Sequence, residues 1–191
     1  MVDNKNASEI RSNQELINFI NHGNSVKYMF FWGHHTAKNQ HVDKSCFSQW
    51  HMSGFEIDNV YYKTAEHFMM AKKAELFSDS FNVKNVLKSE HPAEAKKIGR
   101  NVKGFKEEVW LKNRFNLVVE GNLAKFSQNE ELKAFLLATK SRVLVEASPV
   151  DDIWGIGLAS DDKKVSDPYK WKGLNLLGYS LMEVREKLLN S

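Results

Sequence analysis

The chain has 191 residues, of which 42% are hydrophobic and 27% charged, a balance typical of one globular domain and not of a disordered or fibrous protein. A net charge of +3 suits a phosphate-bearing ligand, but a dedicated duplex-DNA binder usually carries a denser basic face. The single cysteine, Cys46, excludes an internal disulfide, and no run of 18 apolar residues occurs that would span a membrane. The polar N-terminal residues do not resemble a secretion signal, so we expect a cytoplasmic protein.

The first part of the chain predicts one appended helix followed by short strands. Residues 1–24 are expected to form an N-terminal helical segment appended to the domain, capped by a box of Ser12 and Glu15 and stopping at His22-Gly23. β-branched and aromatic residues predict a buried strand over 26–32. Residues 55–62 predict a hairpin, and the His-rich stretch before it predicts a loop.

The rest of the chain predicts mainly helices. Apolar residues at helical spacing predict a helix from a Thr64 cap to about Phe77. Residues 151–173 hold glycines, a proline and many charged residues, which predict a long functional loop. The other expected elements are helices from Pro92 to Gly99, over 105–126, after Asn129 and over 176–189, and a strand over 142–146. The sequence thus predicts a single α+β domain over 1–191, mostly helical with a few short strands.

Two ionisable residues share one face of the predicted 64–77 helix. Glu66 and Lys73 are seven positions apart, so at ~100° per residue they differ by about 20° in direction. Side chains lean toward the helix N-terminus, and Lys73 is therefore expected to reach back toward the Glu66 carboxylate. A structural reading stays open, because a carboxylate favours a first helical turn and a lysine can extend to solvent.

Several short motifs give the chain a resemblance to a known family. They are residues 31–34 (FWGH), 46–50 (CFSQW), 62–73 (YKTAEHFMMAKK), 97–100 (KIGR), 151–157 (DDIWGIG) and 175–178 (NLLG). In their order and spacing they resemble the YbiA-like (NADAR) family of N-glycosidases, over roughly residues 28–188. The TAEH and MMAKKA segment and the WGIG loop are the most specific part of this resemblance.

The resemblance implies a YbiA-like fold and hydrolysis of N-glycosidic bonds in ribose compounds. The implied substrates are a phosphoribosylamino-pyrimidine intermediate of riboflavin synthesis or ADP-ribose attached to guanine in nucleic acid, and no metal or redox cofactor is implied. It also implies that Glu66 is the acid/base and Lys73 an essential amine. Residues implied to line the ligand site are Arg100, Asp151, Trp154 and Asn175.

Other site residues are expected from the residue types themselves. Trp32 and Trp50 stand near strand ends, where an aromatic ring can sandwich a base, although ordinary burial is equally compatible with the sequence. Gly155, beside Trp154, allows the backbone to approach a ligand closely. A nucleic-acid substrate predicts a basic patch beside the site, drawn from Lys96, Lys97, Arg100, Lys163, Lys164, Lys170 and Lys172.

Two alternatives remain at this point. A zinc site built from His34, His35, His41, Cys46 and His51 matches no standard ligand spacing, and a surface loop explains these residues adequately. A non-catalytic module that binds ADP-ribose or nucleotides needs the same pocket but does not need Glu66 to exchange protons. Release of a free base separates the second alternative from an enzyme. Oligomeric state does not follow from the sequence.

Overall fold

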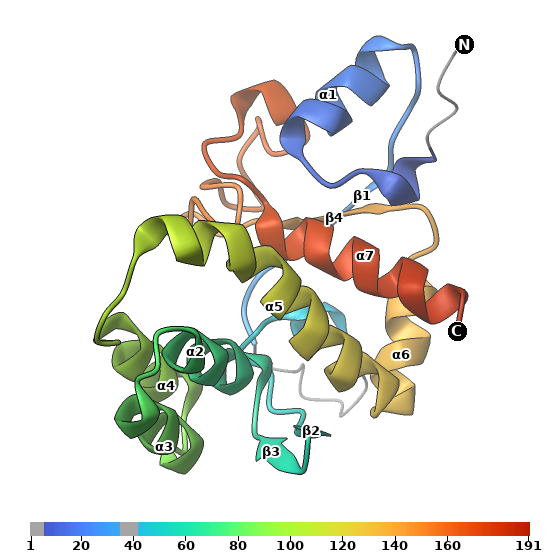
Figure 1. Ribbon diagram of the computed structural model, residues 1–191. Coiled ribbons are helices and arrows are strands. Elements are labelled where there is room, and N and C mark those ends of the chain that lie inside the picture. The colour runs from blue at the N-terminus through green and yellow to red at the C-terminus, as the bar shows by residue number, and fades with distance from the viewer. Residues whose placement is uncertain (1–5, 35–41) are drawn as a thin grey trace.

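A computed structural model describes residues 6–34 and 42–191 and confirms the α+β class (Figure 1). The helices are α1 (Asn13–Asn21), α2 (Ala65–Leu76), α3 (Ser80–Lys88), α4 (Pro92–Arg100), α5 (Glu107–Ser127), α6 (Glu130–Leu137) and α7 (Leu176–Leu189). Short 3-10 helices are η1 (Ala7–Glu9), η2 (Lys44–Phe47) and η3 (Pro168–Lys170). The strands are β1 (Tyr28–Phe31), β2 (Phe55–Ile57), β3 (Val60–Tyr62) and β4 (Val143–Glu146).

The strands form two separate pairs. β1 and β4 run parallel, with Tyr28 opposite Val143 and Phe31 opposite Glu146. Parallel strands are usually covered on both faces, and Phe31 and the first three residues of β4 are at most 1% exposed. β2 and β3 form the predicted hairpin, and Asp58 and Asn59 at its turn both have positive φ, as tight hairpin turns require.

α2 lies in the interior of the helical part. Its Thr64 cap accepts a hydrogen bond from the His67 amide, and eight of its twelve residues are buried. A helix buried on most faces needs neighbours on each, and α3, α4 and α5 all contact it. α5 lies between this group and α7 (Figure 1). Glu66 and His67, two ionisable residues of α2, are therefore buried in the protein.

α3 was not expected from the sequence. The segment SFNVKNVLK contains two valines and two asparagines, which have modest helix propensity. Its Asp79 cap accepts hydrogen bonds from the amides of Asn82 and Lys103, and Val86 is fully buried. Tertiary packing and the cap therefore override weak local preference.

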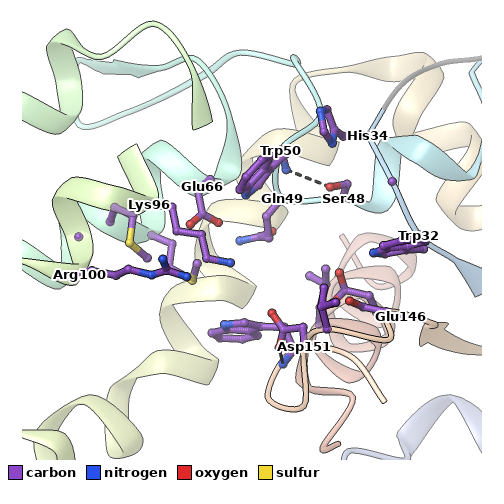
Figure 2. A pocket seen from close by; sticks show the side chains of 18 of the residues that line it. Trp32, His34, Ser48, Gln49, Trp50, Glu66, Lys96, Arg100, Glu146 and Asp151 are labelled. Carbon is purple, nitrogen blue, oxygen red and sulfur yellow. Dashed lines mark hydrogen bonds between the residues drawn. The ribbon is translucent and has the colours of Figure 1, made fainter. Parts of the chain in front are cut away.

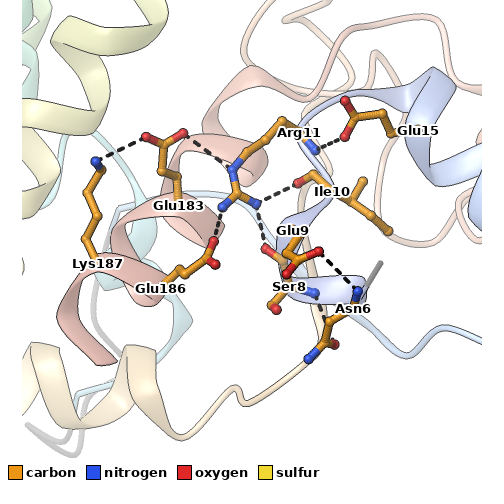
Figure 3. A network of polar contacts seen from close by, with 9 residues as sticks. All are labelled: Asn6, Ser8, Glu9, Ile10, Arg11, Glu15, Glu183, Glu186 and Lys187. Carbon is orange, nitrogen blue, oxygen red and sulfur yellow. Dashed lines mark hydrogen bonds and ion pairs between the residues drawn. The ribbon is translucent and has the colours of Figure 1, made fainter. Parts of the chain in front are cut away.

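The N-terminal residues pack on α7. Arg11 lies between Glu183 and Glu186 of α7 and also donates to the carbonyls of Ser8 and Ile10 (Figure 3). Ser12 caps α1 as expected, but the Glu15 carboxylate accepts from the Arg11 amide at 2.9 Å and not from Ser12, so the expected reciprocal box is wrong.

The predicted loop after β4 contains only η3 as regular structure. Its backbone is tied to the parallel pair, because the Ile156 amide donates to the Glu146 carbonyl at 3.0 Å. In the ranges 6–34 and 42–191 no helix is long and apolar enough to cross a membrane.

Candidate active site

A cavity opens at the carboxyl ends of the parallel strands. Its volume is about 700 Å³. Trp32, Gly33 and His34 follow β1, while Glu146 ends β4, so the strand ends form one wall. α2 and α4 form the facing wall, and the loop after β4 contributes Asp151 and Trp154. Crevices at the carboxyl ends of parallel strands are common ligand sites because side chains from several segments converge there.

Glu66 is the most buried ionisable residue of the cavity. Its side chain is 2% exposed, and its Oε1 atom has no hydrogen-bond partner among the described residues. The backbone amide of Glu66 donates to the Gln49 carbonyl at 2.9 Å, which fixes the start of α2 against the preceding loop. A buried carboxyl oxygen without a partner is costly, and such groups are concentrated at functional sites.

The environment raises the pKa of Glu66 to about 7. Burial is the largest cause, since the ionised carboxylate loses its hydration. The positive charge of Lys96 opposes this rise, as do a hydrogen bond from the Trp50 side chain and the charge of Arg100, whereas Asp151 adds to it. A carboxyl group that titrates near neutral pH can both donate and accept a proton.

Lys73 lines the same cavity but does not pair with Glu66. Its ammonium donates to the Gly99 carbonyl at 2.9 Å and lies 4.5 Å from the centre of the Phe105 ring. The expectation that it reaches back to the Glu66 carboxylate is therefore wrong, because the end of α4 offers a closer acceptor. Burial lowers the pKa of Lys73, and the Glu66 charge acts in the opposite direction. The two groups interact electrostatically without direct contact.

Lys96 is the cation with the largest influence on Glu66, although the sequence named it only as a candidate for a basic patch beside the site. It lies one helical turn before Arg100 on α4, so both reach the cavity. Figure 2 shows the Lys96 side chain extending beside Glu66, and its amine is 5.8 Å from the centre of the Trp50 ring. The spacing of four residues between Lys96 and Arg100 was the available signal.

Glu146 is a cavity residue that sequence reasoning missed. Its carboxyl lines the cavity, and burial raises its pKa to about 8, with smaller contributions from Asp151 and, in the opposite direction, from Lys96. A glutamate ending a strand has no distinctive local pattern. The only signal was its place at the carboxyl end of a predicted strand.

Trp32, Trp50, Arg100, Asp151 and Trp154 all line the cavity. Trp32 is 55% exposed, a large value for an aromatic ring at a cavity edge. The Asp151 carboxylate accepts from the amides of Ile153 and Trp154 and so shapes the loop that carries Trp154.

Gly155 and Asn175 lie outside the cavity lining, contrary to expectation. The Asn175 side chain accepts from the Glu146 amide at 3.0 Å and donates to the Leu144 carbonyl at 2.9 Å, so it is committed to β4. A Cβ atom on Gly155 would lie 2.9 Å from the Glu146 carbonyl, so glycine is needed there for packing against the protein's own backbone. Both residues support the wall of the site without contacting the cavity.

Two buried residues of α5 hold the loop that carries Trp50. Lys125 is 0% exposed and donates to the carbonyls of Cys46 at 2.6 Å and Ser48 at 2.9 Å. Asn122 donates to the Gln49 side chain at 2.7 Å. Burial lowers the pKa of Lys125 to about 8. The loop is therefore positioned by an interior cation.

Replacing Lys125 by methionine should destabilise the protein. The change removes both hydrogen bonds from the interior, and we expect the free energy of unfolding to fall by about 2–4 kcal/mol. Urea denaturation measures this effect. Lys112→Met, on an exposed position of the same helix, is the matched control and should change stability by less than about 0.5 kcal/mol. Equal stability of the two variants would contradict a positioning role for Lys125.

The zinc alternative gains no geometric support from the part of the chain that the structure describes. No group of three or more His, Cys, Asp or Glu side chains that would hold a metal ion occurs there. Cys46 is buried, and His51 contacts the Ser53 hydroxyl at 3.2 Å. His35 and His41 lie outside the described residues.

Comparison with known protein families agrees with this fold and site. The NADAR domain model matches residues 30–189, and the chain belongs to this family. It is 41% identical over 168 residues to the N-glycosidase R617 of Acanthamoeba polyphaga mimivirus, covering 84% of this chain and 96% of that protein. It is 30% identical to the N-glycosidase YbiA of Escherichia coli K12, covering 81% of this chain and 86% of YbiA.

A solved structure has the same architecture. The NMR structure of the E. coli protein YbiA superimposes with a TM-score of 0.70 and 28% identity, over 87% of this chain and 88% of that one. The expected YbiA-like fold is confirmed. The family and the fold thus agree with the resemblance seen in the short motifs.

Proposed function

We propose that this chain is a hydrolase that cleaves the N-glycosidic bond between a ribose C1′ and a nitrogen. Its relatives R617 and YbiA are named N-glycosidases, which supports cleavage of an N-glycosidic bond. The observation that carries the proposal is Glu66, a buried carboxyl with an unpaired oxygen, facing a cavity that also holds Lys73, Lys96 and Arg100. This arrangement combines a group that can exchange protons with cations that can bind phosphate.

The chemistry requires help at both ends of the bond. Breaking C1′–N leaves electron deficiency on C1′ and places an electron pair on the departing nitrogen. Glu66 is proposed as the acid/base, since its pKa of about 7 lets it donate a proton as an acid or activate water as a carboxylate. Lys96 and Arg100 are proposed to bind the substrate phosphate, and Trp50 is proposed to contact the ribose or the base.

Lys73 is proposed to be an essential amine. Burial lowers the pKa of its ammonium, which is the direction required for an amine that attacks C1′ of an opened sugar to form a Schiff base. Borohydride added during turnover should then leave a reduced sugar adduct on Lys73, detected by peptide mass spectrometry. Lys72, which pairs with Glu75 at 2.9 Å, is the internal control and should stay unmodified. A clean absence of adduct would instead assign Lys73 to orienting the ribose hydroxyls as a cation.

The substrate is proposed to be ADP-ribose attached to guanine in nucleic acid or a phosphoribosylamino-pyrimidine. Incubation of the purified chain with an ADP-ribosylated guanine oligonucleotide and, in parallel, with the aminouracil phosphoriboside shows which one releases its base. A nucleic-acid substrate also predicts that release slows steeply with salt, because exposed lysines such as Lys97, Lys163 and Lys164 would contact phosphates. Tight binding without release from either compound would favour a non-catalytic nucleotide-binding module.

The N-terminal 24 residues are proposed to be an appendage to a single domain that spans 1–191. They precede the residues matched by the family model. Ile10 and Leu16 are nonetheless fully buried in the common core, and Tyr179 of α7 donates to the Asn13 side chain at 2.9 Å. These contacts support an appendage that folds with the domain and not apart from it.

A further inference from the structure

The cavity has two chemically different walls. Lys96 and Arg100 lie with Glu66 on one side, while Trp32, Glu146 and Asp151 lie on the other (Figure 2). A substrate with a phosphate at one end and a base at the other is therefore oriented by charge. Its phosphate belongs beside the cations, and its base beside the exposed Trp32 ring, which offers a face for stacking.

Glu146 lies on the cavity wall where the base is expected, and one of its carboxyl oxygens has no hydrogen-bond partner among the described residues. The residue as a whole is half-buried, but its Oε2 atom is inaccessible to solvent and has no hydrogen-bond partner among the described residues. A carboxyl oxygen left in this condition loses its hydration without compensation. Glu66 Oε1 is in the same condition on the facing wall. Two unpaired buried carboxyl oxygens thus line a single cavity.

The backbone of Glu146 is held firmly. Its amide donates to the Asn175 side chain at 3.0 Å, its carbonyl accepts from Ile156 at 3.0 Å, and it pairs with Phe31 across the parallel strands. These contacts satisfy the backbone hydrogen-bonding groups of Glu146, so its carboxyl group can interact with a ligand. A group that must meet a reacting atom needs this kind of fixed support.

We propose, on the basis of the function proposed above, that Glu146 is the acid that protonates the departing base and that Glu66 activates the water. As C1′–N breaks, its electron pair goes to the nitrogen, which takes the proton of Glu146. Water then adds its oxygen to C1′, either directly or after Lys73 has formed its Schiff base there and is displaced as the free amine, and gives a proton to the Glu66 carboxylate. The products are the free base and the ribose, one water is consumed, and the proton returns from Glu66 to Glu146 through solvent.

The electrostatics of the two carboxyls support this division. Asp151 and Glu66 add to the burial that raises the pKa of Glu146 to about 8, with only Lys96 opposing them. Lys96, Arg100 and the Trp50 hydrogen bond restrain the pKa of Glu66 to about 7. The neighbours of Glu146 thus favour its protonated form, whereas two cations and a hydrogen bond favour the carboxylate form of Glu66, as an acid and a base acting together require.

The test compares two leaving groups in Glu146→Gln and Glu66→Gln. The first substrate is whichever of the two candidate ribosides the wild-type chain hydrolyses, and the second is the same riboside with its base N-methylated, so that the base is cationic and leaves without taking a proton. We expect Glu146→Gln to reduce kcat at least ~100-fold on the first and less than ~10-fold on the second. Glu66→Gln should reduce both, because water must still be activated.

The pH profile provides an independent readout. In the wild-type chain kcat should fall as pH rises through about 8, where Glu146 loses its proton, and this basic limb should be missing in Glu146→Gln. Equal losses on both substrates, or an unchanged basic limb, would overturn the role of Glu146. If the wild-type chain hydrolyses neither riboside, the proposed function itself fails, which is a distinct result. A purely structural role would lower activity on both substrates alike and leave the limb in place.

Discussion

Glu66→Gln should lower the rate of base release at least ~100-fold while making the protein more stable above neutral pH. The amide has nearly the same shape as the carboxyl but cannot exchange a proton. It also removes a charge that is 2% exposed and has an unpaired oxygen. Loss of activity with a gain of stability is the signature of a buried functional group. Turnover within a few-fold of wild type would remove Glu66 from the mechanism.

The stability gain has a defined pH dependence. The pKa of Glu66 is 4.5 unperturbed and about 7 in the folded protein, so the folded state retains the proton that the unfolded chain loses. Below pH 4.5 both states are protonated and the charge costs nothing. The cost to the wild-type fold grows as pH rises from 4.5 and is complete above about 7. At 1.36 kcal/mol per pH unit it reaches about 3 kcal/mol.

Urea denaturation at pH 4 and pH 8 measures this effect. Glu66→Gln should match wild type at pH 4 and exceed it at pH 8. The matched control is Glu108→Gln, because Glu108 occupies the same second position of α5 and is exposed. It should change stability by less than about 0.5 kcal/mol at either pH. A gain that is equal at both pH values would show that ionisation of Glu66 is not the cause.

Gly178→Ala should cost about 3 kcal/mol of stability. A Cβ atom there would lie 2.1 Å from the Leu144 carbonyl oxygen and 2.6 Å from the Asn175 side chain. The oxygen belongs to β4, which is buried and hydrogen-bonded to Asn175, so it cannot move without disturbing the parallel pair. The clash outweighs the gain of about 1 kcal/mol that alanine brings to a helix.

Gly99→Ala is the informative comparison. A Cβ atom there would meet the Met70 sulfur at 2.0 Å, but that atom is the end of a flexible side chain. We expect a smaller loss of stability than for Gly178→Ala, together with altered activity, because Met70 lines the cavity. Urea denaturation gives the order of the two variants. The reverse order would show that β4 yields more easily than its burial implies.

Elements with local signals were predicted well from the sequence. The bounds of α7 and the hairpin turn at Asp58-Asn59 follow from periodicity and turn chemistry, which act over a few residues. The parallel pairing of β1 with β4 joins residues more than a hundred positions apart, and no local pattern encodes it. α3 was missed for a similar reason, since its stability comes from packing against α2 and α4.

The candidate site also combines features with local sequence signals and features that depend on contacts between distant segments. Helical geometry correctly placed Glu66 and Lys73 on one cavity wall, but it gave no indication that the Gly99 carbonyl of another helix binds the Lys73 ammonium. Lys96 was a candidate for a basic patch, but nothing in the sequence placed it next to Glu66, and Glu146 resembled an ordinary strand residue. Asn175 lies in a motif of the family, yet its side chain supports β4. Contacts between distant segments decide these roles.

The concentration of indole rings around the cavity has a practical consequence. Four of the five tryptophans, Trp32, Trp50, Trp110 and Trp154, line it. A nucleotide entering this space comes close to most of the chain's intrinsic emitters at once, and stacking on an indole ring quenches its fluorescence. The unlabelled protein therefore carries its own optical probe of ligand occupancy, usable with inactive variants and with compounds that are never turned over.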